Sequence, residues 1–457
     1  TYTVFGHSYV IPRLLQALLG ALTCLLIYWL GYRYFDELTA KIAMAMAALY
    51  WPFIFFDGEL LLTSLALFFN MLVLVSTTVA FERRGVFWLY SGFAFALAAL
   101  TRPNILLFGL FLGFYLIFEA FKKERSWQEP LLLLLGTVLL IAPVTIRNYY
   151  VSNDFVLVAW QGGVNFYIGN NPHSDGHTAI VPGTRPDWQG GFIDTIAIAR
   201  TEMGRKLAPS EISWFWLSKG LKFIVSEPLQ WGKLLLRKLT LFVLAPEVPN
   251  NLSLYFYRQF SLSLSLPLLG YALVGPLGYS GILMMRKKWR DNALLLSYFL
   301  VYSSSIILFF VCARYRIQVV PILLLFAASF VSSALKSWHE KEWSAARYLF
   351  GVFLLCFVVI NCAWFWYDGH LPEKDLASHI TMGNAYVKTK SWALARQYYE
   401  KAVQLNLSEP GVFLDLALVC LRQGDKKSAL YYSNEAARRD VGDRFGGKIA
   451  RIRAASR

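Results

Sequence analysis

The feature that most constrains this chain is a series of apolar segments, each about 20 residues long, that recur over most of the sequence. A helix of that length crosses the hydrocarbon core of a bilayer and satisfies its own backbone hydrogen bonds. Ten such segments are recognisable: 10–31, 38–56, 60–80, 86–101, 103–121, 129–146, 260–285, 292–312, 317–335 and 347–366. Because 56% of the 457 residues are hydrophobic and only 16% are charged, the sequence predicts an all-α polytopic membrane protein.

Short basic stretches between these segments indicate the orientation, because Lys and Arg beside membrane helices stay preferentially on the cytoplasmic side. All four stretches fall on one side of the ten-span arrangement: 83–84, 122–125, 286–290 and 336–347. The extracytoplasmic side is then expected to hold a long loop over 147–259 and everything after Trp366. The chain begins with Thr1, also on that side, so we expect a further N-terminal helix and a first external loop upstream of it.

The sequence changes character after the last apolar segment, becoming polar and helix-favouring. Small residues recur there with a period of 34: Gly383 with Ala417, Ala395 with Ala429, and Ala402 with Ala436. This spacing is typical of tetratricopeptide (TPR) repeats, in which small residues let paired helices approach. We therefore expect a membrane domain over 1–366, TPR-like repeats over 372–440 and a basic tail over 441–457. Generic amphipathic helices are the alternative interpretation of the repeats.

The distribution of charge bears on the partners. The net charge of +15 is spread over membrane loops and the C-terminal tail, so no nucleic-acid partner is expected. Repeats of this kind present grooves to other proteins, so a protein partner is expected for them.

Four motifs beside the predicted spans combine Arg, Asn, Gly and Pro on the extracytoplasmic side. They are ALTRPN (99–104), APVTIRNY (142–149), GGVNFYIGNNP (162–172) and ARYRIQVVPILLL (313–325). Together they resemble the integral-membrane glycosyltransferases of family 39, the protein O-mannosyltransferase group, and their bacterial relatives that include the aminoarabinose transferases of lipid A. The resemblance extends from Tyr9 to Trp366.

This resemblance implies a C-type glycosyltransferase fold, a helical membrane bundle with an extracytoplasmic active site. It also implies the reaction: an inverting transfer of a hexosyl or pentosyl group from a polyprenyl-phosphate donor to a hydroxyl of a protein, lipid or glycan. The expected location is a bacterial inner membrane, in contact with membrane lipids, with the repeats on the same face as the active site.

Such a transfer requires cations that stabilise the departing phosphate. Arg102 is the first candidate, since it stands between two predicted helices and resembles the basic residue of the family's corresponding turn. Arg314, Tyr315 and Arg316 form a second external cluster, and Arg147 directly follows a predicted span. For each arginine the alternative role is a membrane anchor that reaches the lipid headgroups.

The transfer also requires a carboxylate that accepts the proton of the acceptor hydroxyl. Asp57 and Glu59, within FFDGELLL, are the candidates, and they could also hold a divalent cation; an ordinary polar turn is the alternative. The family's principal acidic motif lies in the first external loop, which we expect to precede this sequence. The main base is therefore expected there.

A loop rich in Gly and Asn suits a polar ligand, so Asn165, Asn170 and Asn171 are expected to contact substrate. No metal site is assigned, because His173 and His177 share no face in a loop that contains Gly. A transporter or flippase of lipid-linked sugars is the alternative function. A transporter needs ionisable residues near mid-membrane, whereas the charged candidates here collect at one face, which favours the enzyme.

Overall fold

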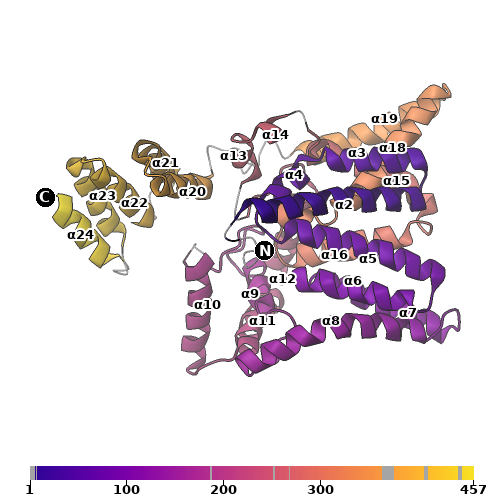
Figure 1. Cartoon of the computed structure of the whole chain (residues 1–457), viewed down its shortest axis with the longest axis horizontal. Coiled ribbons are helices and arrows are strands. Elements are labelled where there is room, and N and C mark those ends of the chain that lie inside the picture. Colours follow the sequence, from indigo (N-terminus) through magenta and orange to yellow (C-terminus); the bar gives the residue numbers. More distant parts are fainter. Residues whose placement is uncertain are drawn as a thin grey trace. The chain divides into compact units, whose positions relative to one another are not determined.

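The computed structural model describes residues 6, 8–185, 188–250, 253–266, 268–362, 375–405, 410–440 and 445–456 (Figure 1). This part of the chain is helical, and its one β-type pairing is an isolated bridge between Tyr50 and Leu269. The chain divides into two compact units. The membrane unit comprises Thr1–Asn250 and Leu262–Tyr367, and the C-terminal unit comprises Asn251–Ser261 and Asp368–Arg457.

Helices of membrane-spanning length and composition dominate the membrane unit. Five qualify: α2 (Val10–Tyr34), α5 (Thr63–Arg83), α8 (Gln128–Ser152), α18 (Val320–His339) and α19 (Trp343–Asn361). Three further apolar helices are shorter: α6 (Phe87–Thr101), α7 (Ile105–Phe121) and α16 (Ala293–Leu308). The predicted class, an all-α membrane fold, is thereby confirmed.

Two of the predicted spans are broken. Residues 38–56 form α3 (Glu37–Ala48) and α4 (Trp51–Gly58), and residues 260–285 include α14 (Leu262–Ser265) and α15 (Tyr271–Met284), which the 3-10 turn η1 (Met285–Lys288) follows. The two breaks satisfy each other's backbone groups. Trp51 N–H donates to Leu269 O at 3.0 Å, and Leu269 N–H donates to Leu49 O at 3.0 Å. Pairing across the breaks therefore replaces the helical hydrogen bonds that each break loses.

Helices of the membrane unit pack backbone to backbone at glycines. A Cβ on Gly92 of α6 would lie 2.4 Å from Leu133 O of α8, and one on Gly281 of α15 would lie 2.1 Å from Phe326 O of α18. Such small-residue contacts are typical of membrane bundles, where close packing drives association. Helices α5, α6, α7 and α8 lie alongside one another, and α9–α12 gather at one end of them (Figure 1).

The segment between α8 and α15 carries four helices before Asn250. They are α9 (Gly162–Gly169), α10 (Trp188–Met203), α11 (Pro209–Ser226) and α12 (Pro228–Val243). Helices α9, α10 and α11 share a core that includes Ile168, Ala199 and Trp216, and it extends to Phe310 and Cys312 of the stretch that follows α16. Helices α9, α10 and α11 therefore pack on the chain just before the ARYR motif.

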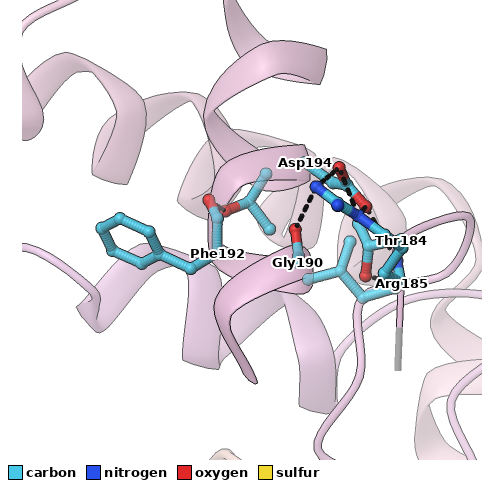
Figure 2. Close-up of polar contacts among 7 residues, drawn as sticks. Thr184, Arg185, Gly190, Phe192 and Asp194 are labelled. Carbon is cyan, nitrogen blue, oxygen red and sulfur yellow. Dashed lines mark hydrogen bonds and ion pairs between the residues drawn. The ribbon is translucent and has the colours of Figure 1, made fainter. Parts of the chain in front are cut away.

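Loop conformation before α10 is fixed by an ion pair. Arg185 folds back on Asp194 of α10, with Nη2 at 2.8 Å from Oδ1, and also donates to Gly190 O (Figure 2). Arg185 is thus committed to the loop's own structure.

The C-terminal unit contains α13 (Leu254–Arg258), α20 (Leu376–Lys388), α21 (Trp392–Leu405), α22 (Pro410–Arg422), α23 (Lys426–Arg439) and α24 (Gly446–Ser456). Helices α22 and α23 begin and end 34 residues after α20 and α21, respectively. Five alanines of the 34-residue pattern are fully buried: Ala395, Ala402, Ala417, Ala429 and Ala436. A Cβ on Gly383 would lie 2.6 Å from the Tyr399 ring, so the smallest residue stands where two helices approach most closely.

Candidate active site

The ARYR motif forms the short helix α17 (Ala313–Arg316), which leads into α18. Its backbone is held by two distant pieces of the segment between α8 and Asn250. Val311 N–H donates to Gly176 O, and Ala313 N–H donates to Val248 O, each at 2.8 Å. These bonds tie the start of the motif to that segment.

Arg102 and Arg314 converge on Tyr315. Arg102 Cζ lies 4.5 Å from the centroid of the Tyr315 ring, and Arg314 Cζ lies 5.3 Å from it. Arg314 Nη2 also donates to Tyr315 Oη at 3.3 Å. We call these three residues the arginine cluster. The structure therefore brings together two arginines that the sequence placed in separate motifs.

The charge of the arginine cluster is not balanced by protein. Among the described residues, neither Arg102 nor Arg314 forms an ion pair, and the Nε atoms of both are buried without a hydrogen-bond partner. Two guanidinium groups over one ring, without a counter-ion, carry a desolvation penalty that an anion would offset. The planar fork of an unpaired guanidinium matches the oxygens of a phosphate.

Arg316 lies in a different environment from its neighbours. It is 1% exposed, and Nη1 donates to Phe242 O at 3.1 Å and Leu244 O at 2.6 Å, while Nη2 donates to Pro246 O at 3.0 Å and Glu247 Oε2 at 2.9 Å. Four of its five N–H groups are thus committed to protein, which favours a structural role for Arg316 over the predicted phosphate contact. Residues two apart on a helix point about 200° apart, which separates Arg316 from Arg314.

A buried carboxylate extends the Arg316 network toward α4. Tyr50 Oη donates to Glu247 Oε1 at 3.1 Å, and Arg316 Cζ lies 3.7 Å from the Tyr271 ring centroid. Tyr50 directly precedes α4, the helix that carries Asp57. The network therefore connects the ARYR motif with the stretch from Asp57 to Glu59, which we call the acidic turn. Neither Tyr50 nor Glu247 stood out in the sequence, because nothing local marks partners that lie so far apart along the chain.

The acidic turn is held by the first helix. Arg13 Nε donates to Gly58 O at 2.8 Å, and Gln16 Nε2 donates to Glu59 O at 2.8 Å and Leu61 O at 2.9 Å. Sequence reasoning missed both α2 residues, although two polar side chains three apart on an apolar helix were a usable signal. Helix α2 binds the backbone of the turn, and the carboxylates of Asp57 and Glu59 form no ion pair among the described residues.

The Asp57 carboxyl group is half-buried against α2, where a Cβ on Gly20 would lie 2.0 Å from Oδ2. Burial raises the pKa of Asp57 to about 6, and the nearby Ser64 hydroxyl partly offsets this shift. Burial also raises the pKa of Glu59, while Arg13 opposes the shift. A carboxylate with a raised pKa is a stronger base than an ordinary one, which suits proton removal near neutral pH.

Gln318 connects the acidic turn with the arginine cluster. Its Nε2 donates to Thr63 O at 3.3 Å, beside Ser64, and its Oε1 accepts from Asn70 Nδ2 at 2.9 Å. Its backbone N–H donates to Tyr315 O at 3.2 Å. This buried amide therefore links α5, which follows the acidic turn, to α17.

Two of the three predicted substrate asparagines build the loop instead of facing a ligand. Asn170 Nδ2 donates to Phe166 O and Leu308 O, and Oδ1 accepts from Trp231 Nε1 at 3.0 Å and Lys238 Nζ at 3.1 Å. Both Asn170 and Asn171 are 1% exposed. Asn171 Nδ2 likewise donates to two carbonyls of α9, and its Oδ1 caps the next turn. These bonds favour a structural role for Asn170 and Asn171 over the predicted substrate contact.

Asn165 and Arg147, the remaining predicted residues, form few contacts with other side chains. Asn165 is half-buried and forms no side-chain hydrogen bond among the described residues, so its side chain stays available. Arg147 is exposed near the end of α8 and donates to Asn148 Oδ1 at 3.3 Å, which fits the membrane-anchor alternative. The described residues contain no group of three or more His, Cys, Asp or Glu side chains that could hold a metal ion.

A comparison with known families bears on the N-terminal part of this site. Residues 1–146 match the model of the family described as dolichyl-phosphate-mannose-protein mannosyltransferase. The N-terminal third is similar to membrane mannosyltransferases. The match includes the acidic turn and Arg102, whereas ARYR and the external segment lie beyond it. No curated protein and no solved structure matches the chain.

Proposed function

We propose that the protein is a membrane glycosyltransferase that transfers a sugar from a polyprenyl-phosphate donor to an acceptor hydroxyl at the extracytoplasmic face. The observation that carries this proposal is the convergence of Arg102 and Arg314 on Tyr315 without a counter-ion among the described residues. A half-buried pair of unbalanced cations at the end of a helical bundle suits a lipid-linked phosphate. The similarity of residues 1–146 to mannosyltransferases supports the same class of donor.

The arginine cluster would act on the leaving group. The acceptor oxygen attacks the anomeric carbon of the sugar while the bond from that carbon to the phosphate oxygen breaks, and the electron pair passes to the phosphate. A single displacement of this kind inverts the anomeric centre. The phosphate gains charge in the transition state, so preorganised guanidinium groups stabilise that state more than the bound donor.

The acidic turn would act on the acceptor. The Asp57 carboxylate accepts the proton of the attacking hydroxyl or supports a further carboxylate that does so, and Glu59 can bind a sugar hydroxyl or a divalent cation. The proposal for Asp57 rests on its raised pKa, on its freedom from ion pairs, and on the Gln318 connection to Tyr315.

The distribution of basic loops supports the proposed position of the site on the extracytoplasmic face. The loop that joins α7 to α8 carries Lys122, Lys123 and Arg125, and it lies at the end of the bundle opposite to α9–α12 (Figure 1). Basic loops favour the cytoplasm, which supports an external position for α9–α12 and α17. We also propose that α20–α23 are two TPR repeats, on the basis of their 34-residue spacing.

The test is turnover by the full-length natural protein, purified into lipid nanodiscs. A polyprenyl-phosphate mannose labelled in the sugar is supplied with a membrane extract as the source of acceptors, and release of polyprenyl phosphate is followed. Label that moves to an acceptor, with loss of transfer in Arg314→Ala, supports the proposal. Transport of intact donor across the membrane without cleavage would instead identify the transporter alternative.

A further inference from the structure

An apolar groove lies between three helices of the membrane unit, α15, α18 and α19, which pack on one another at one edge of the bundle (Figure 1). Its walls are Leu277 of α15, the α18 side chains from Phe330 to Trp338 and the α19 side chains from Trp343 to Phe353. The groove has a volume of about 520 Å³, which is typical of ligand pockets. Because α18 starts directly after α17 and only its second half lines the groove, the groove is a separate site from the arginine cluster.

Close packing of α15 on α18 forms the floor of this groove. A Cβ on Gly278 would lie 2.8 Å from Leu323 O, and one on Gly281 would lie 2.1 Å from Phe326 O. These contacts advance together along both helices, so α15 and α18 run parallel. The 3-10 turn η1, which follows α15 directly and carries Arg286, Lys287 and Lys288, therefore lies at the same end of the bundle as the α18–α19 turn.

Two tryptophans mark the mouth of the groove, one on each side of the α18–α19 turn. The ring centroids of Trp338 and Trp343 are 5.2 Å apart, and the two residues are 66% and 51% exposed. Tryptophans concentrate at the boundary between lipid headgroups and hydrocarbon. The mouth of the groove is therefore expected at headgroup level, with Phe330 and Phe353 at the depth of the acyl chains.

Arg347 is the cation of this groove. It lies one helical turn beyond Trp343 and lines the groove, its Nε donates to Trp343 O at 3.3 Å, and it forms no ion pair among the described residues. Of the two acids in the α18–α19 turn, Glu340 pairs with Lys336 at 3.9 Å, and Glu342 stands at the N-terminus of α19, where the helix dipole favours it. An unpaired guanidinium beside an apolar groove offers the planar fork that matches phosphate oxygens.

We propose that this groove binds an anionic phospholipid, with an acyl chain along the apolar walls and the headgroup phosphate on Arg347. Lipid is the molecule that surrounds a membrane helix at this depth, and basic pockets between membrane helices bind anionic headgroups. The cations of η1 at the same end of the bundle favour an anionic lipid over a zwitterionic one. This inference rests on the membrane fold and on the contacts of the groove, and it does not depend on the proposed enzymatic activity.

Photo-labelling of the full-length natural protein in lipid nanodiscs tests the proposal. Two phospholipids with the same diazirine-bearing acyl chain are compared, one with the phosphatidylglycerol headgroup and one with phosphatidylcholine. The anionic lipid should label peptides of 330–353 about fivefold more than the zwitterionic lipid, as expected for one arginine near a phosphate. Peptides of α7, whose Phe114 is 69% exposed, should be labelled equally by both lipids.

Variants separate the contribution of the charge from that of the apolar walls. Arg347→Gln should abolish the preference for the anionic lipid, Arg347→Lys should retain part of it, and Arg83→Gln, at an exposed residue that ends α5, should leave it unchanged. Ala334→Trp fills the groove and keeps Arg347, so it should reduce labelling of 330–353 by both lipids. Ala334→Leu provides the same comparison if the larger side chain prevents folding.

Three results would overturn the proposal. Equal labelling of 330–353 by the two lipids would show that lipid fills the groove without selection. A preference that survives Arg347→Gln would place the phosphate elsewhere. Labelling of α7 without any labelling of 330–353 would show that protein, from this chain or another copy, covers the groove.

Discussion

Two arginine environments lie two residues apart in α17, and they differ in how the protein balances their charge. Arg316 donates to three carbonyls and to Glu247, so its buried charge is fully engaged. Arg314 shares Tyr315 with Arg102, and neither of these two forms an ion pair among the described residues. A half-buried charge without a counter-ion costs stability, and such charges gather at functional sites. This difference indicates that Arg316 stabilises α17 and its surroundings, whereas Arg102 and Arg314 are available to bind a ligand.

The largest expected effect, a loss of folded protein, comes from removing the Arg316 side chain, whose charge is balanced by Glu247. Arg316→Met leaves Glu247 buried without its cation, and loss of one partner of a buried pair costs about 3–5 kcal/mol. We expect little folded protein, measured as the monodisperse fraction in size-exclusion chromatography and as the melting temperature.

A double variant sharpens this prediction. Arg316→Met with Glu247→Leu removes both charges, and replacement of a whole buried pair by apolar residues is often close to neutral. The double variant should therefore recover part of the folded yield. If Arg316→Met folds as well as the natural protein, the structural role of Arg316 is wrong.

Removing Arg102 or Arg314 should lower turnover and leave the fold intact. Loss of one preorganised contact to a developing charge costs about 3 kcal/mol, on the order of a hundredfold in rate. Arg102→Ala and Arg314→Ala should each lower turnover by that factor at saturating donor, and Arg102→Lys should recover part of it because a point charge remains.

The control for this comparison is Arg200→Ala, at an exposed residue of α10. It should turn over donor at the natural rate, and all three alanine variants should keep the natural melting temperature or exceed it. Normal turnover by Arg102→Ala would leave that residue with the membrane-anchor role.

The acidic turn should confer a pH dependence on the rate. Burial raises the pKa of Asp57 to about 6, and the carboxylate form is the one that accepts a proton. Turnover should therefore fall about tenfold between pH 7 and pH 5, as expected for a single group with that pKa. In Asp57→Asn the residual rate should lack this decline. An identical acid limb in the variant would assign the titration to another group.

A smaller effect is expected from the titration of Lys238. It is buried on α12, its Nζ donates to Asn170 Oδ1, and burial lowers its pKa to about 7. Between pH 7 and the higher pKa of the unfolded chain, the unfolded state binds the extra proton, so stability rises with pH. The melting temperature should rise between pH 7 and 9, and Lys238→Met should flatten this rise.

The sequence predicted the helical membrane class because apolar segments of spanning length leave few alternatives. It did not predict the breaks at Tyr50 and Leu269, since their backbone groups are satisfied by each other across a long separation. Hydropathy reports which residues avoid water. It does not report where two irregular stretches meet.

The sequence predicted individual residues of the candidate site but not the contacts that their side chains form. Arg102, Arg314 and Tyr315 came from local motifs, and the structure brings them together. Arg316 looked equivalent to Arg314 because the sequence does not show that carbonyls of 242–246 surround it. The same reason explains Asn170, whose Gly-rich surroundings suggested a ligand loop, whereas its side chain is bound by Trp231 and Lys238.

The most direct test of the arginine comparison is a double-mutant cycle on binding of polyprenyl phosphate to the purified protein in nanodiscs. If Arg102 and Arg314 hold one phosphate, each alanine substitution should weaken binding by about tenfold or more, with the double variant losing less than the product of the two effects. Arg200→Ala should bind as the natural protein does. Unchanged affinity in both single variants, or an equal loss in Arg200→Ala, would contradict the account.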